Sequence, residues 1–376
     1  MAKSYNNLWG RMVDLDNIKA AIHAAAKGKR YKRSVRTALA RIDKTAMYIK
    51  GLLDEGKWRP PAIRQSYAYK DGVAQKERII VHPDFTEQVV HHLLIDYIIE
   101  PIFKPTFYRW SCGSVPGRGQ EGMAKYIRRM AKKHPEKMRY HVEIDVRKCF
   151  DTISTDAIFK AVSAKIRDKK VLGVVGLILE ANELKLPDGG TRKGGVPIGL
   201  YTSPWFVNIV LSRADHYLKD DCSIFMVVRF IDDFGLVGPN RRQLEKAGKG
   251  IGEYLIQWGM KLKEKGGAVP AVKSFRSAHG HKARFTGFHF NAEGRLQVRD
   301  KIYVRSCRLG AQMRKAAKKR RVSAFVASKM ISYGGRFRAF GAYAAFPAKV
   351  LKGIKFYALR QKVSAKAKLH KMREVA

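Results

Sequence analysis

Two adjacent carboxylates, Asp232 and Asp233, stand between two short apolar runs within residues 228–237. Successive side chains of a straight strand point to opposite faces, so both carboxylates can converge on one cation only at the bend of a tight hairpin. Nucleotidyl transfer needs such an arrangement, because two Mg²⁺ ions about 3.5–4 Å apart must hold the attacking oxygen and the leaving phosphates. A solvent-exposed turn is the alternative interpretation, because Asp is common in turns.

A third carboxylate, Asp145, follows the apolar-rich residues 140–144. These residues predict a buried strand, whose end is a place where a sheet can present a metal ligand. Phe150, at the end of the same segment, can stack under a nucleotide sugar, where its ring would clash with a 2′-hydroxyl and select deoxynucleotides. Burial in the core is the alternative and the more common role of phenylalanine.

The chain is strongly basic: among its 376 residues, 75 Lys and Arg oppose 32 Asp and Glu, a formal net charge of +43. A field of this sign attracts polyanions, so nucleic acid is the expected partner and an anionic membrane is the alternative. No apolar run approaches the roughly 20 residues that a spanning helix needs, and the N-terminus lacks the apolar core of a signal peptide. We therefore expect a cytoplasmic protein of two or three lobes.

The four cysteines are widely scattered and show no paired spacing (Cys112, Cys149, Cys222 and Cys307). This pattern argues against a zinc ribbon or a disulfide framework and indicates reduced thiols. A small buried hydrophobic group is the expected role of such cysteines.

The first part of the chain predicts helices and one hairpin. Residues 14–58 have helical periodicity interrupted by a basic run at residues 27–33, which either contacts phosphate or is a solvated helix connection. Residues 62–82 predict a hairpin, with Lys76 and Arg78 on one face of its second strand. Two cations there can hold a triphosphate, and protection of an exposed edge is the alternative.

A longer helix is predicted from Pro83 to about Phe103, and it contains His91 and His92. Neighbouring helical positions point about 100° apart and seldom ligate one ion, so we expect these histidines to pack or cap rather than to bind metal. Before it, a second N-terminal helix is expected to carry five apolar residues (Leu39, Ile42, Met47, Ile49 and Leu52).

Two glycine-containing loops precede predicted helices. In residues 107–120, Arg109 and Arg118 are candidates for contact with a template backbone, to which glycine allows close approach. A flexible surface loop is the alternative. Residues 194–205 form a Gly/Pro-bent loop that enters a helix and is suited to contact with a template and an incoming nucleotide.

The character of the chain changes after the carboxylate pair. An amphipathic helix is expected at residues 242–258, and residues 261–263 and 284–290 give short strand signals. From Lys301 onward there are 21 Lys or Arg, and Glu374 is the single acidic residue. This composition predicts a helical lobe that grips nucleic acid.

Four segments occur in an order and spacing that resemble a reverse transcriptase, over about residues 70–290. The catalytic hairpin of that family usually begins with Tyr, where this chain has Phe230. The segments are the first palm motif (Asp145 with Phe150), the template-positioning motif (residues 195–199 and 202–204), the catalytic hairpin (residues 230–233) and the primer-grip region (residues 285–288).

Within that family the chain is most similar to the bacterial lineage of retrons, group II introns and diversity-generating retroelements. Retrons and introns usually have Gln where this chain has Ile198, whereas the Ile-Gly pair followed by Thr-Ser is similar to the diversity-generating enzymes. Those enzymes copy a template RNA with errors at adenines, although their usual Gln is replaced here by Pro204. Defence-associated and retron-type enzymes are the alternatives.

The resemblance implies an α+β right-hand polymerase. Residues 1–136 would form an N-terminal helical extension and fingers, residues 137–295 a palm with a small antiparallel sheet backed by helices, and residues 296–376 a basic helical thumb. The implied partners are a template RNA, cDNA or primer, dNTPs, a structured non-coding RNA and a small basic accessory protein, with no membrane. A non-catalytic basic RNA-binding protein and an RNA-dependent RNA polymerase are the rival interpretations.

The resemblance also implies roles for individual residues, with two Mg²⁺ ions as cofactors and Mn²⁺ as the alternative. Ile198 cannot make the hydrogen bonds of a Gln, so looser nucleotide selection is expected. The implied roles are metal binding (Asp145, Asp232, Asp233 and the Val146 backbone), proton donation to pyrophosphate (Lys263), dNTP binding (Lys76, Arg78, Val146, Arg147, Lys148, Cys149, Phe150, Ile198 and Gly199) and template or primer binding (Arg109, Arg118, Pro197, Ser203 and Gly287).

Overall fold

The computed structural model describes residues 3–70, 77–263, 270–276, 282–286 and 288–299, together with Val304 and Arg308. The expected basic thumb at residues 296–376 lies almost entirely outside this described part of the chain, as does Cys307. No helix among the described residues has the length and apolar character needed to cross a bilayer.

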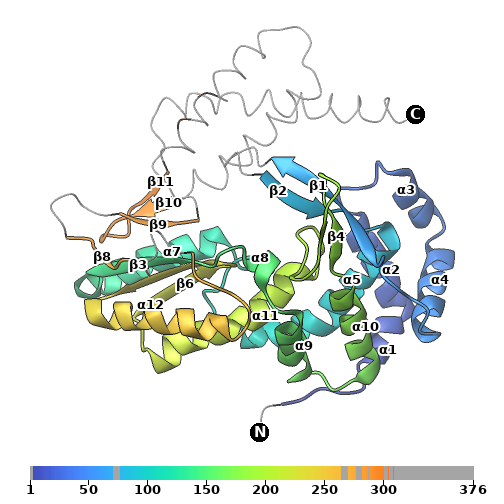
Figure 1. Cartoon of the computed structure of the whole chain (residues 1–376), viewed down its shortest axis with the longest axis horizontal. Coiled ribbons are helices and arrows are strands. Elements are labelled where there is room, and N and C mark those ends of the chain that lie inside the picture. Colours follow the sequence, from blue (N-terminus) through green and yellow to red (C-terminus); the bar gives the residue numbers. More distant parts are fainter. Residues whose placement is uncertain are drawn as a thin grey trace.

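A four-stranded antiparallel sheet carries the three carboxylates (Figure 1). Its strand order is β6-β7-β3-β8. Strand β3 pairs with β7 in a register that sets Asp145 opposite Asp233, and β7 pairs with β6 so that Phe230 also stands opposite Asp233. The strands are β3 (Tyr140–Asp145), β6 (Met226–Phe230), β7 (Asp233–Gly238) and β8 (Lys273–Ser274).

Helices cover one face of this sheet (Figure 1). Helix α12 buries Leu244, Ala247 and Ile251 at helical spacing, and they share one hydrophobic core with Val142 and Leu236 of the strands. Because side chains alternate along a strand, the carboxylate of Asp145 points to the opposite face. The helices of this layer are α8 (Cys149–Thr152), α9 (Thr155–Ser163), α11 (Ser203–His216) and α12 (Arg241–Ile256).

A smaller core covers part of the carboxylate face. Met226 and Val228 of β6 pack there with Tyr126 of α7 and with Phe285 and Phe288. The two phenylalanines belong to a three-stranded antiparallel sheet of order β11-β10-β9. The elements on this side are α7 (Gln120–Lys133), β9 (Ala283–Phe285), β10 (Phe288–Phe290) and β11 (Leu296–Val298).

The N-terminal residues build helices around a second sheet, of order β2-β1-β4-β5, in which β1 pairs antiparallel with β2 and parallel with β4. Asp14 and Asp84 each cap a helix by accepting a backbone N–H three residues on. The elements are α1 (Trp9–Val13), α2 (Leu15–Ala26), α3 (Arg33–Ala40), α4 (Ile42–Asp54), β1 (Ile63–Lys70), β2 (Glu77–Val81), α5 (Phe85–Leu94), the π-helical turn η1 (Ile95–Ile99), α6 (Glu100–Phe103), α10 (Lys169–Glu180), β4 (Glu183–Lys185) and β5 (Thr191–Arg192).

Most expected elements are present. The hairpin at residues 62–82 and the helix at residues 242–258 are confirmed. The expected second N-terminal helix is instead two helices, because the backbone leaves helical geometry at Arg41, where φ is −125°. Of the apolar residues expected on this helix, Ile49 is buried and Met47 is 62% exposed. Residues 261–263 form an isolated bridge rather than a strand.

A buried polar chain joins the N-terminal sheet to α11. Arg64 of β1 donates to Glu87 of α5 through Nη2 at 2.7 Å, and the same carboxylate oxygen lies 3.3 Å from Nε2 of His91. Nδ1 of His91 lies 2.9 Å from the Thr202 hydroxyl. Burial lowers the pKa of His91, so the ring is neutral and links Glu87 to Thr202 by hydrogen bonds.

The second histidine, His92, also serves packing. Its Nδ1 lies 2.9 Å from the Asp96 carboxylate, and its ring stacks on Tyr201 with centroids 4.0 Å apart. The Tyr201 hydroxyl donates to the other oxygen of Asp96 at 2.8 Å. Both histidines therefore pack within hydrogen-bonded networks, as expected.

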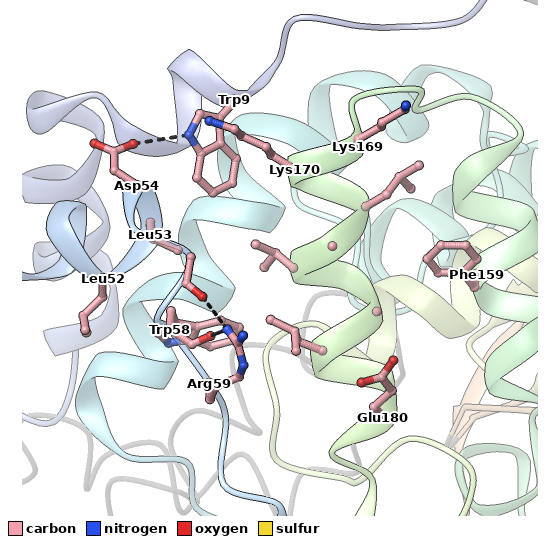
Figure 2. A pocket seen from close by; sticks show the side chains of 16 residues that line it. Trp9, Leu52, Leu53, Asp54, Trp58, Arg59, Phe159, Lys169, Lys170 and Glu180 are labelled. Carbon is pink, nitrogen blue, oxygen red and sulfur yellow. Dashed lines mark hydrogen bonds between the residues drawn. The ribbon is translucent and has the colours of Figure 1, made fainter.

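A cavity of about 620 Å³ lies between α4 and α10 (Figure 2). Leu52 and Leu177 contribute apolar walls, and the indole N–H of Trp9 donates to Asp54 at 3.3 Å. The ammonium group of Lys170 stands 5.6 Å from the centre of the Trp9 ring. The cavity shares no lining residue with the carboxylate site described below.

We expect Glu87→Gln to lower the free energy of unfolding by about 3 kcal/mol, because it leaves the Arg64 guanidinium buried without its carboxylate. Urea unfolding followed by tryptophan fluorescence measures this change. The matched control is Glu245→Gln, which breaks an exposed ion pair with Arg241 and should cost less than about 0.5 kcal/mol. Equal effects of the two substitutions would contradict a structural role for the buried chain.

Candidate active site

The turn between β6 and β7 carries the carboxylate pair. Asp232 occupies the turn and Asp233 begins β7, so the expected hairpin bend is confirmed. Ile231 has a φ of +58°, a left-handed conformation that is unfavourable for a β-branched residue. Surrounding contacts must therefore hold this turn in place.

Asp145 joins the pair from the neighbouring strand. It stands opposite Asp233 in the β3–β7 register. The backbone N–H of Val146 donates to the Asp232 carbonyl oxygen at 3.2 Å, which ties the end of β3 to the turn. The three carboxylates thus lie at one end of the sheet, contributed by two segments far apart in sequence.

Lys263 approaches the same carboxylates. Its Nζ lies 2.9 Å from Oδ2 of Asp145, and its backbone N–H donates to the Asp145 carbonyl oxygen at 2.8 Å. The hydrogen bond between Nζ and the Asp145 carboxylate raises the pKa of Lys263, so its ammonium group remains protonated near neutral pH. A protonated ammonium group at this position can donate a proton to a leaving oxygen.

Asp145 and Asp233 line a cavity of about 530 Å³. Burial, together with the neighbouring Asp232 and Asp145, raises the pKa of Asp233 to about 7. This shift expresses the electrostatic cost of gathering three carboxylates, which a bound cation would offset. Cationic side chains also line the cavity (Lys263, Lys273, Arg284 and Arg299).

The oxygen donors at this site fit the expected Mg²⁺ ions, which prefer carboxylate and carbonyl oxygens. In the described residues, no group of three or more His, Cys, Asp or Glu side chains is gathered closely enough to hold a metal by itself. Lys263 pairs with Asp145 at this site. A bound cation would offset the repulsion from Asp232 and Asp145 that contributes to the raised pKa of Asp233.

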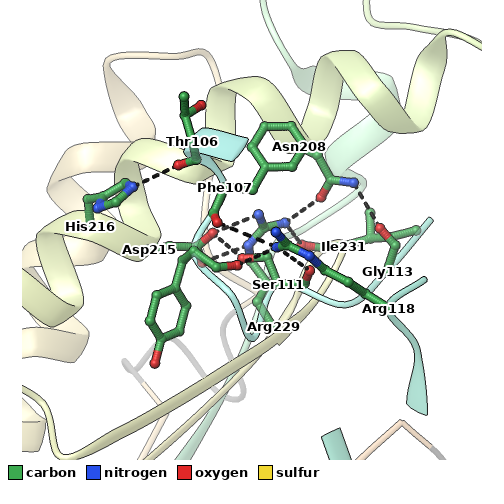
Figure 3. Close-up of polar contacts among 11 residues, drawn as sticks. Thr106, Phe107, Ser111, Gly113, Arg118, Asn208, Asp215, His216, Arg229 and Ile231 are labelled. Carbon is green, nitrogen blue, oxygen red and sulfur yellow. Dashed lines mark hydrogen bonds and ion pairs between the residues drawn. The ribbon is translucent and has the colours of Figure 1, made fainter. Parts of the chain in front are cut away.

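A buried ion pair is hydrogen-bonded to the β6–β7 turn (Figure 3). Arg229 of β6 donates to both oxygens of Asp215 on α11, each at 2.7 Å. Its Nη1 donates to Oδ1 of Asn208 at 2.8 Å and to the Ile231 carbonyl at 2.9 Å. Arg229, Asp215 and Asn208 are all fully buried. This network therefore holds the carbonyl of the left-handed residue directly.

The loop at residues 107–119 closes the same network (Figure 3). The Ser111 hydroxyl donates to Asp215 at 2.5 Å, and Asn208 donates from Nδ2 to the Gly113 carbonyl at 2.8 Å. A Cβ at Gly113 would stand 2.5 Å from Cγ1 of Ile231, so only glycine allows the loop to pack on the turn. The expected alternative of a flexible surface loop is wrong, because most of these contacts are buried.

The template-positioning loop packs beside Phe150 and β2. The Phe150 carbonyl accepts the Val196 N–H at 2.7 Å, and the Phe150 ring is half-buried against the main core. The Val81 N–H donates to the Ile198 carbonyl at 2.7 Å. Gly199 has a φ of +118°, and a Cβ there would overlap the Val81 carbonyl oxygen.

Several predicted site residues fall around this centre and others do not. Lys76 and Gly287 lie outside the described residues. Arg78, Arg147 and Lys148 are exposed on β2 and on the turn after β3. Cys149 is buried, and this burial raises the pKa of its thiol, so its side chain packs in the core.

Three predicted template contacts are turned inward. The Arg118 guanidinium donates to the carbonyls of Tyr108, at 2.8 Å, and Lys104, at 3.2 Å (Figure 3). Ser203 is buried and its hydroxyl donates to the carbonyl of Pro197, also buried, at 2.6 Å. The Ser203 hydroxyl and the two terminal nitrogens of Arg118 therefore stabilise their own loops.

The sequence reasoning missed Arg229, Asp215 and Asn208. A signal was available: an arginine inside the apolar strand residues 226–230 requires a buried partner. Asn208 and Asp215 are seven residues apart on an apolar helix and therefore share one face. Their pairing with Arg229 could not be chosen without the fold.

The family model for reverse transcriptase (RNA-dependent DNA polymerase) matches residues 69–290 of this chain. The group II intron-encoded protein LtrA of Lactococcus lactis subsp. cremoris is 28% identical over 166 residues, which are 44% of this chain and 27% of that protein. Protein YkfC of Escherichia coli (strain K12) is 25% identical over 182 residues, which are 48% of this chain and 47% of YkfC.

The fold is also similar to a solved structure, apo telomerase from Candida tropicalis truncated from its C-terminal domain. The TM-score is 0.50 at 15% sequence identity, over 66% of this chain and 58% of that chain. The expected right-hand polymerase fold, with helices and small antiparallel sheets, is confirmed. The chain spans between 27% and 47% of the length of these two curated relatives.

We expect Asn208→Ala to lower kcat for nucleotide incorporation by about 10- to 100-fold and to change KM by less than about twofold, because the carboxylates lose their alignment while the nucleotide contacts remain. Asn208→Asp keeps the acceptor for Arg229 but loses the donor to the Gly113 carbonyl, so it should restore only part of kcat. Steady-state kinetics measures both constants. The control is Ser212→Ala, a buried change on the same helix; an equal loss of kcat there would contradict a specific positioning role.

Proposed function

Because the chain belongs to the reverse transcriptase family, we propose that it is an RNA-directed DNA polymerase that makes cDNA from a template RNA by two-metal nucleotidyl transfer. The observation that carries this proposal is the convergence of Asp145, Asp232 and Asp233 at one end of the palm sheet. Their separation in sequence makes a chance cluster of surface carboxylates a poor explanation. The raised pKa of Asp233 supports a site that is completed by cations.

Asp145, Asp232, Asp233 and the Val146 carbonyl would hold the two Mg²⁺ ions. When bound, the ions lower the pKa of the primer 3′-hydroxyl and neutralise charge on the leaving phosphates. Lys263, held beside Asp145, would protonate the pyrophosphate. Lys76 and Arg78 would hold the triphosphate, with the backbone after Asp145 assisting.

Phe150 would select deoxynucleotides. Its backbone is fixed by the hydrogen bond to Val196, and its ring is half-buried beside the template-positioning loop. A rigid aromatic ring at the sugar leaves no room for a 2′-hydroxyl. We therefore assign dNTPs rather than NTPs as substrates.

The finer assignment is a diversity-generating retroelement with error-prone copying, and Ile198 favours it. The aliphatic side chain beside Gly199 lacks the amide that a Gln would offer to a nucleotide or template. A structured non-coding RNA and a small basic accessory protein would be its partners in the cytoplasm. A defence-associated or retron-type reverse transcriptase is the alternative.

Primer extension on an RNA template with Mg²⁺ tests the polymerase proposal. With dNTPs, we expect DNA synthesis by the parent protein and its loss in Asp232→Ala/Asp233→Ala, which removes two metal ligands. The matched control is Asp220→Ala/Asp221→Ala, an exposed Asp-Asp pair in the same chain, which should retain synthesis. Loss in the control would point to a general effect of lost acidic charge.

The same assay separates the rivals. An RNA product made from NTPs would overturn the role given to Phe150 and indicate an RNA polymerase. Nucleic-acid binding without Mg²⁺-dependent synthesis, on the native RNA and with its partner proteins, would indicate a non-catalytic RNA-binding protein. Errors concentrated at template adenines in the sequenced cDNA would favour the diversity-generating retroelement over the defence enzymes.

We expect Ile198→Gln to reduce misincorporation by about fivefold, because one added hydrogen bond is worth about 1 kcal/mol. Ile198→Met is the control, since it has nearly the length of Gln but no amide. Deep sequencing of cDNA from one template compares the error spectra. An error spectrum that Gln and Met change equally would mean that the amide does not govern fidelity.

A further inference from the structure

A third cavity, of about 770 Å³, lies beyond the outer edge of the palm sheet. Its wall is the loop at residues 107–119, which pairs with edge strand β6 through backbone bonds of Trp110 and Cys112 to Arg229. Helix α7 forms the other wall. This cavity shares no lining residue with the carboxylate cavity, so a ligand can occupy each at the same time.

All the charged side chains that line this cavity are cationic. Five of its lining residues are Lys or Arg and none is Asp or Glu (Lys104, Arg109, Arg118, Lys125 and Arg129). Lys104 is paired with Glu100 and Lys125 with Glu121, and Arg118 is committed to loop carbonyls. Arg109 and Arg129 are exposed, and neither forms an ion pair with a carboxylate of the described residues. These two guanidinium groups remain available to an anion.

Aromatic rings hold the two arginines in place. Trp110 stacks on Tyr126 with ring centroids 3.8 Å apart and an interplanar angle of 11°. The Arg109 guanidinium lies 5.5 Å from the centre of the Trp110 ring, and that of Arg129 lies 5.9 Å from it. Cation–π contact restrains a guanidinium without neutralising its charge. The arginines are therefore pre-organised before any ligand binds.

We propose that this cavity is a binding site for a single-stranded polynucleotide, separate from the catalytic cleft. Arg109 and Arg129 bind successive phosphates, and unpaired bases stack on the cluster formed with Trp110, a combination typical of single-strand binding. The strand is held beside the β6–β7 hairpin, because residues 110–113 contact that hairpin directly. Two sources share this chemistry, an RNA and the newly made cDNA.

Binding of fluorescent 12-nucleotide oligo(U) and oligo(dT) at several salt concentrations tests the site. For Arg109→Ala/Arg129→Ala we expect about tenfold weaker binding, and a salt dependence reduced by about 0.7 per lost phosphate contact. The matched control is Arg36→Ala/Arg41→Ala, which removes two exposed arginines within and just after α3 and should weaken binding less than about twofold. Tighter binding of oligo(U) identifies RNA as the source, and tighter binding of oligo(dT) identifies cDNA.

Photo-crosslinking locates the bound strand. A 4-thiouridine oligonucleotide should crosslink to peptides from residues 104–129 in the parent protein and lose these crosslinks in the double variant. Crosslinks confined to the carboxylate cavity, equal losses in the two arginine pairs, or equal competition by polyglutamate of matched charge would each overturn the proposal. Neither measurement requires DNA synthesis, so failure of the proposed function and failure of this site are distinguishable.

Discussion

The buried ion pair between Arg229 and Asp215 is the interaction on which the candidate active site depends. Burying two charges is costly, and the cost is offset only when the geometry is good and the remaining polar atoms are satisfied. Here both Asp215 oxygens accept hydrogen bonds from the Arg229 guanidinium. Ser111 donates a further hydrogen bond to Asp215, and Asn208 accepts one from Arg229. Three segments distant in sequence are thereby fixed at the strained turn that carries the carboxylates.

The carboxylate cluster is an electrostatic exception within a chain of net charge +43. Burial and mutual repulsion raise the pKa of Asp233, and Lys263 offsets part of the negative charge. Exposed basic groups over the rest of the chain favour polyanions. A small cation bound at this end of the sheet would offset the repulsion among the carboxylates.

Features that depend on local sequence were predictable. The apolar runs around Asp232 and the strand that ends at Asp145 have periods and turn residues that identify them without a fold. The site as a group of neighbours was less accessible, because the contacts of Arg229 cross between a strand, a helix and a loop. Arg118 shows the same limit: a loop arginine suggests a ligand contact, and only the fold reveals the carbonyls that occupy its donors.

The contact between Gly199 and Val81 has a mechanical consequence. Strand β2 carries Arg78 and ends at Val81, whose N–H donates to the Ile198 carbonyl. A side chain at the neighbouring Gly199 would overlap the Val81 carbonyl oxygen. Strand β2, expected to bind the triphosphate, and the loop at residues 195–199, expected to position the template, are therefore in direct backbone contact here. A displacement of the end of β2 would therefore press directly on the backbone of residues 198–199.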